Sequence, residues 1–350
     1  MGMLRFNATV DLSQFWPNKR SDADTMHAVP VGPIMFEAPG KAPKAVTVFK
    51  GAWIKQRKVK DKMVPVPVLG ASGFSIRVQG VDAPELHYTA QDMPSKKKLR
   101  AKGVSQTDAD FAFTSFRQPF GERATAELLA FLKPHAKGGV VSCVVESRVQ
   151  KPNDTFDRYG RMLGEVTLIK KDHQRQSINE WLVLNGWALP AFYDSMFPDE
   201  IDKLLTAENA AGKKGMFGKL DNRTRTIDFK LIERKNYKGK PDALVTGQRD
   251  SLVVMPKLFR RLTTWSVKTR IGLLSNTFQA FLSDNAKKRL GKADCRWLSD
   301  FLKRGKKSPK VRFASLIRNG RLTAKANELV IVEDPTTLKG PNGKPITSWK

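Results

Sequence analysis

Residues 77–85 read Arg-Val-Gln-Gly-Val-Asp-Ala-Pro-Glu and continue a β-branched, alternating stretch that predicts a strand. This strand would deliver Arg77 and Asp82 to one place. Pro84 keeps the residue before it extended and bends the chain, so Glu85 can return toward the same place. Two carboxylates beside a guanidinium can bind a cation or a phosphate, which makes this segment the first candidate site.

Three other short segments carry the same kinds of side chain. Asp22-Ala-Asp24-Thr25 is a tight turn between expected strands, and it could present Asp24 to a cation. Phe120-Gly121-Glu122 opens an expected helix. Asp157-Arg-Tyr-Gly-Arg161 is a turn that leads into a strand and sends a second guanidinium inward. Each segment alone is typical of a solvated turn or a surface hairpin, but all four in this order favour one shared site.

Carboxylates near two arginines suit phosphodiester hydrolysis. Hard oxygen ligands hold Ca²⁺ or a similar ion. Arginine forks bind a phosphate and stabilise the charge that grows on its oxygens. A further carboxylate, not used by the cation, can position or deprotonate water.

As a set, the four segments resemble the motifs of the staphylococcal-nuclease-like (thermonuclease) family over residues 5–220. Members carry an Asp-Gly-Asp-Thr turn, an arginine strand ending in Val-Asp-Thr-Pro-Glu, a Tyr-Gly-x-Glu helix start and an Asp-Lys-Tyr-Gly-Arg turn. Residues 206–218, Thr-Ala-Glu-Asn-Ala-Ala-Gly-Lys-Lys-Gly-Met-Phe-Gly, are also similar to the family's last helix and its Gly-Leu-Trp-Gly ending.

The resemblance implies an α+β fold: an OB-type five-stranded barrel with three helices. It also implies a nuclease that hydrolyses DNA with Ca²⁺ or another divalent cation, with RNA left open as a second substrate. Matched position by position, Asp24 and Asp82 would be metal ligands, together with the carbonyl of Ala83. Residue 83 is alanine where the family has threonine. The replacement should be tolerated if only the backbone carbonyl of this residue binds the metal.

The same matching implies that Glu85 is the general base for the attacking water, and that Arg77 and Arg161 are the phosphate clamps. Enzymes of this family typically cleave the bond to the 5′ oxygen and leave 3′-phosphates. The tyrosines that stack on the nucleotide in the family have only a loose counterpart in Phe192-Tyr193, for which a place in the core is equally expected.

The spacing departs from the family between Asp24 and Arg77, which 52 residues separate where a short hairpin is usual. A rival assignment takes Asp61, in Asp61-Lys-Met-Val, as the metal turn. It keeps the hairpin short but puts Met63 at the ligating position, so Asp24 is preferred.

The chain is expected to divide into a catalytic domain, a linker and a basic, mainly helical C-terminal domain. The expected ranges are 1–220 for the catalytic domain, with insertions at about 32–72 and 88–118, then 221–246 for the linker and 247–350 for the last domain. Strands are expected at 7–10, 25–31, 45–54, 73–81, 139–149 and 161–169, and helices at 121–132, from Ser177 to Gly186 and at 198–214. Beyond the linker we expect helices at 255–265, 275–289 and 294–303, a hairpin at 311–323 around Asn319-Gly320, and a strand at 328–333.

The net charge is +28, from 62 Lys and Arg against 34 Asp and Glu, and it is uneven. Residues 226–350 hold 28 basic and 10 acidic residues. Such an excess predicts a nucleic-acid partner, with an anionic membrane surface as the lesser alternative. Aromatic residues lie among basic ones at 259–265, which suits either a nucleic-acid surface or a helix packed on a core. Since every candidate site residue precedes residue 220, the cleft is expected to lie wholly in the first domain.

Other classes of function are less favoured. The apolar runs are too short to span a bilayer, no signal peptide is visible, and a cytoplasmic location is expected, with delivery by another route left open. Cys143 and Cys295 have no metal-type spacing. The alternative to a nuclease is a catalytically inactive domain of the same fold that binds nucleic acid or protein. Retention of all five candidate side chains favours the enzyme.

Overall fold

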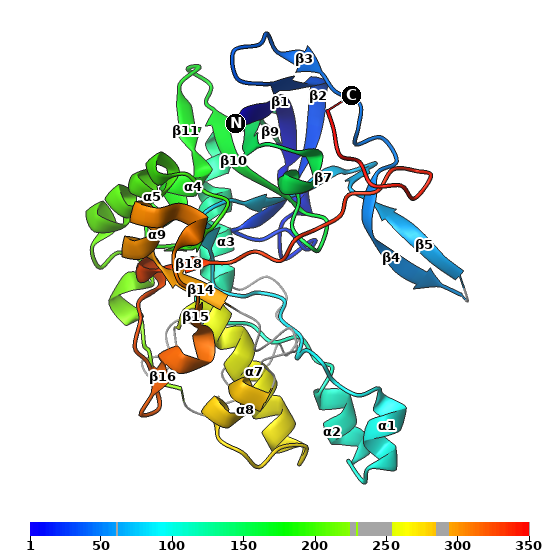
Figure 1. Ribbon diagram of the computed structural model, residues 1–350, viewed down its shortest axis with the longest axis vertical. Coiled ribbons are helices and arrows are strands. Elements are labelled where there is room, and N and C mark those ends of the chain that lie inside the picture. The colour runs from blue at the N-terminus through cyan, green and yellow to red at the C-terminus, as the bar shows by residue number, and fades with distance from the viewer. Residues whose placement is uncertain (61, 225–228, 230–253, 285–293, 350) are drawn as a thin grey trace.

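The computed structural model describes residues 1–60, 62–224, 229, 254–284 and 294–349 (Figure 1). An eight-stranded sheet forms the upper part of the molecule in this view. Its strands are β1 (Gly2–Asp11), β2 (Thr25–Glu37), β3 (Lys44–Ala45), β6 (Leu69–Gly70), β7 (Gly73–Val78), β9 (Val140–Val149), β10 (Met162–Ile169) and β11 (Arg175–Ser177). Three helices accompany it: α3 (Gly121–Leu132), α4 (Ile178–Leu184) and α5 (Pro198–Ala211). The predicted α+β class is therefore confirmed.

Five of these strands pair in a closed cycle. β1 pairs antiparallel with β2 and β9, β9 pairs antiparallel with β10, and β2 pairs antiparallel with β7. β10 completes the cycle by pairing in parallel with β7, which sets Leu163 opposite Arg77. The cycle thus brings the residues that follow the 157–161 turn alongside the strand that carries Arg77.

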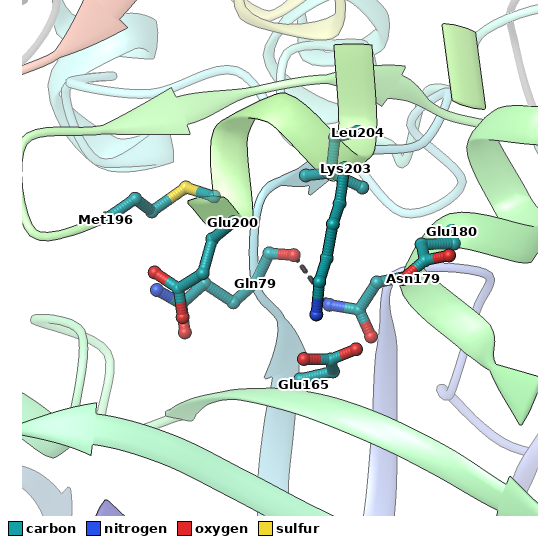
Figure 2. A pocket seen from close by; sticks show the side chains of 8 residues that line it. All are labelled: Gln79, Glu165, Asn179, Glu180, Met196, Glu200, Lys203 and Leu204. Atoms are coloured by element: carbon teal, nitrogen blue, oxygen red, sulfur yellow. Dashed lines mark hydrogen bonds between the residues drawn. The ribbon is translucent and has the colours of Figure 1, made fainter. Parts of the chain in front are cut away.

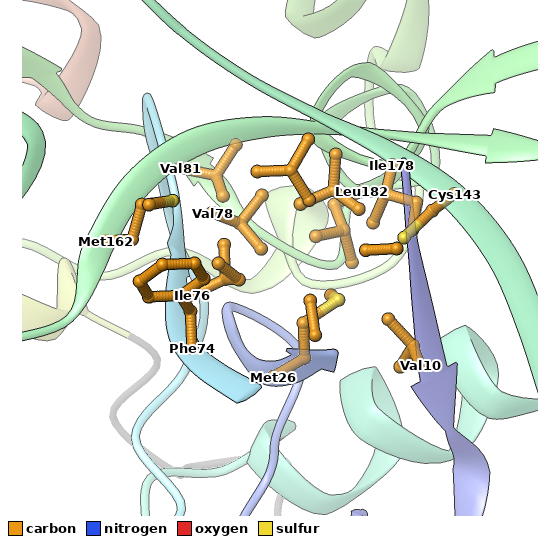
Figure 3. Close-up of a cluster of buried hydrophobic side chains, with 14 of the residues drawn as sticks. Val10, Met26, Phe74, Ile76, Val78, Val81, Cys143, Met162, Ile178 and Leu182 are labelled. Atoms are coloured by element: carbon orange, nitrogen blue, oxygen red, sulfur yellow. The ribbon is translucent and has the colours of Figure 1, made fainter. Parts of the chain in front are cut away.

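Alternation along the strands places apolar side chains inside this cycle. In β1 the side chains of Leu4, Phe6, Ala8 and Val10 are at most 2% exposed, whereas the residues between them face outward. Figure 3 shows how the interior continues across the sheet into α4. The labelled side chains are Val10, Met26, Phe74, Ile76, Val78, Val81, Cys143, Met162, Ile178 and Leu182.

The predicted helices of this half are present. Helix α3 has the bounds expected from its apolar spacing. Helix α4 begins at the predicted cap, where Ser177 Oγ accepts a hydrogen bond of 3.2 Å from the Glu180 amide. Asn179, in its first turn, accepts from the Val166 amide at 3.0 Å, which holds α4 against β10.

The strand predicted at 45–54 is wrong. Residues 46–52 form turns, and the side chains of Val46, Phe49 and Ala52 are buried in the core from there. Their apolar, β-branched character reflects burial rather than pairing in a sheet. The basic segment that follows is a hairpin of β4 (Trp53–Val59) and β5 (Lys62–Pro67), which pair with each other and project from the sheet (Figure 1).

Shorter elements connect the main sheet to the rest of the chain. They are β8 (Val81–Asp82), α1 (Lys96–Ala101), α2 (Gln106–Phe111), β12 (Leu189–Pro190) and β13 (Phe192–Tyr193). Both helices α1 and α2 lie in the predicted insertion at 88–118.

The C-terminal region alternates helices with short strands. Its elements are α7 (Pro256–Arg270), α8 (Phe278–Asp284), β14 (Asp294–Trp297), α9 (Leu298–Arg304), β15 (Val311–Arg312), β16 (Ile317–Arg318), β17 (Arg321–Leu322) and β18 (Leu329–Ile331). The turn between β16 and β17 is the predicted Asn319-Gly320, both with positive φ. The helix predicted from residue 294 begins only at Leu298, because β14 pairs with β18 and β15. A mainly helical domain is therefore not confirmed.

This region shares its cores with the first 220 residues. One core joins Leu258, Phe259 and Leu262 of α7 to Tyr88 and Phe116 of the insertion. The other core includes β18 and C-terminal residues such as Trp349, whose ring stacks on Phe36 at 4.3 Å between centroids. The predicted linker at 221–246 lies almost wholly outside the described residues, so the division into domains stays a prediction.

No helix within the described ranges is long and apolar enough to cross a membrane. Cys143 and Cys295 are both buried, and neither forms a disulfide within the described part of the chain.

Candidate functional site

Asp24 lies in the turn that precedes β2. The Asp22 amide donates to the Thr25 carbonyl at 2.9 Å and closes this turn. The Asp24 carboxylate then points away from solvent, where Oδ2 accepts from the Ala83 amide at 2.8 Å. Oδ1 accepts from the Thr25 hydroxyl at 3.1 Å. A turn at one end of the sheet is thus tied directly to the segment 82–85.

Arg77, on β7, lies between the two aspartates predicted as metal ligands. One guanidinium nitrogen, Nη1, contacts Asp24 Oδ2. The other, Nη2, donates to Asp82 Oδ1 at 2.7 Å and to the Val81 carbonyl at 3.1 Å. Burial alone would lower the pKa of Arg77, but Asp24 and Asp82 outweigh it and raise that pKa well above its usual value.

Asp82 ends β8, which is held in place by pairing with β12. Gly80 makes the turn before it with a φ of +76°. Burial would raise the pKa of the Asp82 carboxyl, but the guanidinium groups of Arg260 and Arg77 lower it below its ordinary value. Asp82 is therefore an ionised, buried carboxylate at neutral pH.

Glu85 is held by the start of α3. The Gln118 amide donates to the Glu85 carbonyl at 2.6 Å, and the Glu85 amide donates to Gln118 Oε1 at 3.3 Å. Gly121 allows the close approach, since a Cβ there would lie 2.8 Å from the Glu85 carbonyl oxygen. Gln118, just before the predicted Phe120-Gly121-Glu122 segment, therefore holds the Glu85 backbone, and Gly121 leaves room for it. The Glu122 side chain instead pairs with Arg117 in the interior.

Arg161 is held by its own turn. Asp157 Oδ1 accepts from the amides of Tyr159 and Arg161 at 2.8 and 2.9 Å, and its Oδ2 accepts from Arg161 Nε at 2.8 Å. The far nitrogen of Arg161 reaches Thr25 Oγ1 at 3.2 Å. Thr25 in turn bonds Asp24, so the second predicted clamp joins the same network.

The structure thus brings together all six residues predicted for the site. Backbone and side-chain contacts connect Asp24, Arg77, Asp82, Ala83, Glu85 and Arg161. The rival residue Asp61 lies outside the described residues.

One residue of this cluster was missed in the sequence. Arg260 of α7 places Nη1 on Glu85 Oε1 and Nη2 at 3.3 Å from Asp82 Oδ2. A guanidinium from the C-terminal region thus contacts two of the predicted site residues. The expectation that the cleft lies wholly in the first 220 residues stays a prediction. In the sequence, the only indication of Arg260 was the group of basic and aromatic residues at 259–265.

Asp22 adds a further buried carboxyl group beside Asp24. Its Oδ1 atom is buried and has no hydrogen-bond partner among the described residues. Burial, followed by the charges of Asp24 and Glu85, raises the pKa of Asp22 well above its usual value. A cation placed near Asp22 and Asp24 would reduce the repulsion between these two carboxyl groups. It would also give the Asp22 Oδ1 atom a partner. The surrounding donors are mostly oxygen atoms, which suit a hard divalent ion.

Within the described ranges, no group of three or more His, Cys, Asp or Glu side chains is arranged to hold a metal ion. The predicted ligand set needs only two such side chains, Asp24 and Asp82, with the Ala83 carbonyl. Arginines now contact both aspartates, so a cation would have to enter beside them or replace them.

Phe192 and Tyr193 both contact the first core, and contact of either with a nucleotide stays a prediction. Phe192 is fully buried in the core. Tyr193 lies near the charges of Arg77 and Asp82, and burial raises the pKa of its hydroxyl.

A separate pocket lies between β10, α4 and α5 (Figure 2). Its lining includes Glu165, Glu180 and Glu200, and Lys203 extends between the last two. None of the six predicted site residues lines it. Its acidic walls would repel a phosphate, so this pocket is not the nucleic-acid site.

The family model of the staphylococcal nuclease homologues matches residues 75–217. This part of the chain is therefore similar to the staphylococcal nuclease homologues, a family whose members are generally nucleases. The match spans fewer than half of the 350 residues. It includes Arg77, Asp82, Glu85 and Arg161 and begins after Asp24. A search of curated proteins finds none that matches the chain.

Proposed function

We propose that the chain is a metal-dependent nuclease that hydrolyses phosphodiester bonds of DNA, with RNA as a second substrate to be tested. The observation that carries this proposal is the meeting of Asp24, Arg77, Asp82, Glu85 and Arg161 in one hydrogen-bonded cluster. Those residues come from three separate segments, and a purely structural ion pair would need only two residues. The family match over 75–217 supports the same conclusion.

We further infer that the closed cycle β1–β2–β7–β10–β9 is the five-stranded OB-type barrel of that family. The parallel contact between β7 and β10 supports this assignment, since it closes the sheet on itself. The region after residue 247 would then be a basic accessory part that binds nucleic acid.

In the proposed reaction Glu85 accepts a proton from a water molecule, whose oxygen attacks the phosphorus. The bond from phosphorus to the 5′ oxygen breaks, and that oxygen leaves with a proton as a hydroxyl, so the other product ends in a 3′-phosphate. Arg161, whose side chain is partly exposed, binds the phosphate and stabilises the charge that develops on its oxygens. Arg77 holds the carboxylates of Asp24 and Asp82 in place.

Asp24, Asp82 and the carbonyl of Ala83 would hold the cation. When bound, Ca²⁺ or a similar ion would neutralise part of the charge on the phosphate. Thr25 fixes Asp24 Oδ1, and the Ala83 amide fixes Oδ2, so the first ligand is already oriented.

The test is digestion of plasmid DNA and of RNA by the purified chain with Ca²⁺, with Mg²⁺ or with EDTA. We expect cleavage with a divalent cation and loss of cleavage in EDTA, because no cation would then neutralise the charge that develops on the phosphate. Cleavage that is unchanged by EDTA would contradict the metal dependence.

A second candidate is a catalytically inactive domain that binds nucleic acid. It is favoured by one observation, the engagement of both Asp82 and Glu85 by Arg260. Binding of DNA without cleavage under any of these metal conditions would select this second function.

The β4–β5 hairpin offers a further test of the proposed binding of nucleic acid. A two-stranded hairpin alone is marginally stable in water, and nearly all of this one is exposed. Lys55 and Arg57 lie on β4 and are both exposed, which suits contact with the phosphates of a duplex. We expect Lys55→Gln with Arg57→Gln to weaken duplex binding. The slope of log affinity against log salt should fall by about 0.9 for each phosphate that these side chains no longer neutralise.

The control removes the same charge elsewhere. Lys213 and Lys214 are exposed just beyond α5, away from the hairpin. Changing both to glutamine should leave the slope nearly unchanged. Equal slopes for the two double variants would show that the hairpin makes no phosphate contact.

A further inference from the structure

Among the described residues, Arg260 is the one guanidinium of the site that comes from outside the matched domain. It lies on α7, 175 positions after Glu85 in the sequence. Its two terminal nitrogens are divided between Glu85 and Asp82. These are the carboxylates proposed as the base and as a metal ligand, so Arg260 reaches the reacting centre.

Helix α7 is firmly fixed in this position. Leu258, Phe259 and Leu262 are at most 1% exposed and pack in the second core. On the same helix, Thr264 Oγ1 bonds the Tyr88 hydroxyl at 2.7 Å and accepts from the Gln91 amide at 3.1 Å. These contacts hold the backbone of Arg260 beside the site.

Accessibility separates the three arginines of the site. Arg77 is 7% exposed, and both of its terminal nitrogens are bonded to protein groups. Arg161 and Arg260 are 29% and 27% exposed. A phosphate that enters the cluster would therefore meet Arg161 and Arg260 before Arg77.

The guanidinium fork suits such a phosphate. It offers parallel donors that match two phosphate oxygens as well as they match carboxylates. An incoming phosphodiester, which carries one negative charge as each carboxylate does, could take the place of Glu85 on this fork. The exchange also frees Glu85 Oε1 for the attacking water.

We propose that Arg260 is a phosphate-binding residue of this site, so that the C-terminal region completes the nuclease centre. This inference rests on the proposed function. In the free protein Arg260 is the counter-ion of Glu85 and Asp82, and with substrate it binds the phosphodiester together with Arg161.

The experiment compares the full chain with R260A, R260K and R270Q. Arg270 is the matched control because it lies on the same helix and faces Asp108 and Phe111 of the insertion. Two quantities are measured on a labelled eight-nucleotide DNA: kcat and KM for cleavage with Ca²⁺, and the dissociation constant by fluorescence anisotropy in EDTA. Circular dichroism and thermal melting establish that each variant is folded.

We expect R260A to lower kcat/KM by about ten- to a hundred-fold and to weaken binding in EDTA. R260K should recover part of the binding, because it keeps the charge without the fork. R270Q should resemble the wild type in both measurements.

The outcomes separate this inference from the proposed function. If the wild type binds DNA but cleaves none, the nuclease proposal fails, and weaker binding by R260A still supports the phosphate contact. If the wild type cleaves and R260A matches it in cleavage and binding, the role of Arg260 is overturned. Faster cleavage by R260A would also overturn it, since Arg260 would then block the site.

Discussion

Substitution of Glu85 by glutamine is expected to lower the rate of DNA cleavage at least about 10²-fold, a typical loss for a general base. Glutamine keeps the size of the side chain and its hydrogen bond to Arg260, but it cannot take a proton from water. The initial rate of cleavage of a labelled oligonucleotide, at saturating Ca²⁺ and substrate, measures this loss.

Glu127→Gln is the matched control. Glu127 lies on α3, is exposed, and pairs with Arg123 in the neighbouring turn of the helix. This variant should keep the wild-type rate, and both variants should melt as the wild type does. Undiminished digestion by a folded E85Q protein would remove Glu85 from the role of base.

The same base predicts a direction for the pH dependence. Burial raises the pKa of Glu85 above its ordinary value of 4.5, and Arg260 offsets part of that rise. Because the base acts in its ionised form, the wild-type rate should fall as the pH drops through this raised pKa. The residual rate of E85Q should then show no such fall over the same acidic range of pH.

Much of the site could be predicted from local sequence. Asp82, Pro84 and Glu85 are close in the chain, and their geometry depends on one strand and one bend. Arg161 is equally local, because Asp157 in its own turn fixes the side chain. Hydrogen bonds between residues close in the chain require particular residues at a fixed spacing, and such a motif can be recognised in the sequence.

Arg260 could not be predicted in the same way. It stands beside Arg261 in a strongly basic region, and nothing local distinguishes the two. Arg260 reaches the site because Phe259 and Leu262 bury the opposite face of α7 in a core shared with residues 88–118. That packing joins segments far apart in sequence, and neither segment alone indicates the other.

Similar reasons explain the errors in the fold. The regular apolar spacing of helix α3 predicts both of its ends to the residue. The segment 294–297 has no such period and forms a strand because β18 and β15 offer it partners. A strand that forms only because distant strands pair with it cannot be predicted from local propensity.

Deletion of residues 226–350 is expected to have the largest effect of all. If the first 225 residues held the whole site, the shortened chain would still cleave a short oligonucleotide. The shared core and Arg260 predict the opposite, loss of cleavage together with loss of stability.

The loss of stability follows from the residues that the deletion removes. Leu258, Phe259 and Leu262 leave the second core, and Trp349 leaves the first. Each large apolar side chain contributes about 1.5–3 kcal/mol when buried, against a total stability of about 5–15 kcal/mol for a typical domain. The melting temperature should therefore fall by more than about 10 °C, or cooperative unfolding should disappear.

Comparison with full-length R260A separates the two causes. R260A removes only the guanidinium, so any additional loss in the shortened chain measures the structural support that residues 226–350 give to the site through both cores. The deletion should also flatten the salt dependence of duplex binding, because it removes a net charge of +18. A shortened chain that cleaves the oligonucleotide with the wild-type kcat/KM would show instead that residues 1–225 form a complete active site, with Arg260 as a neighbour rather than a part of it.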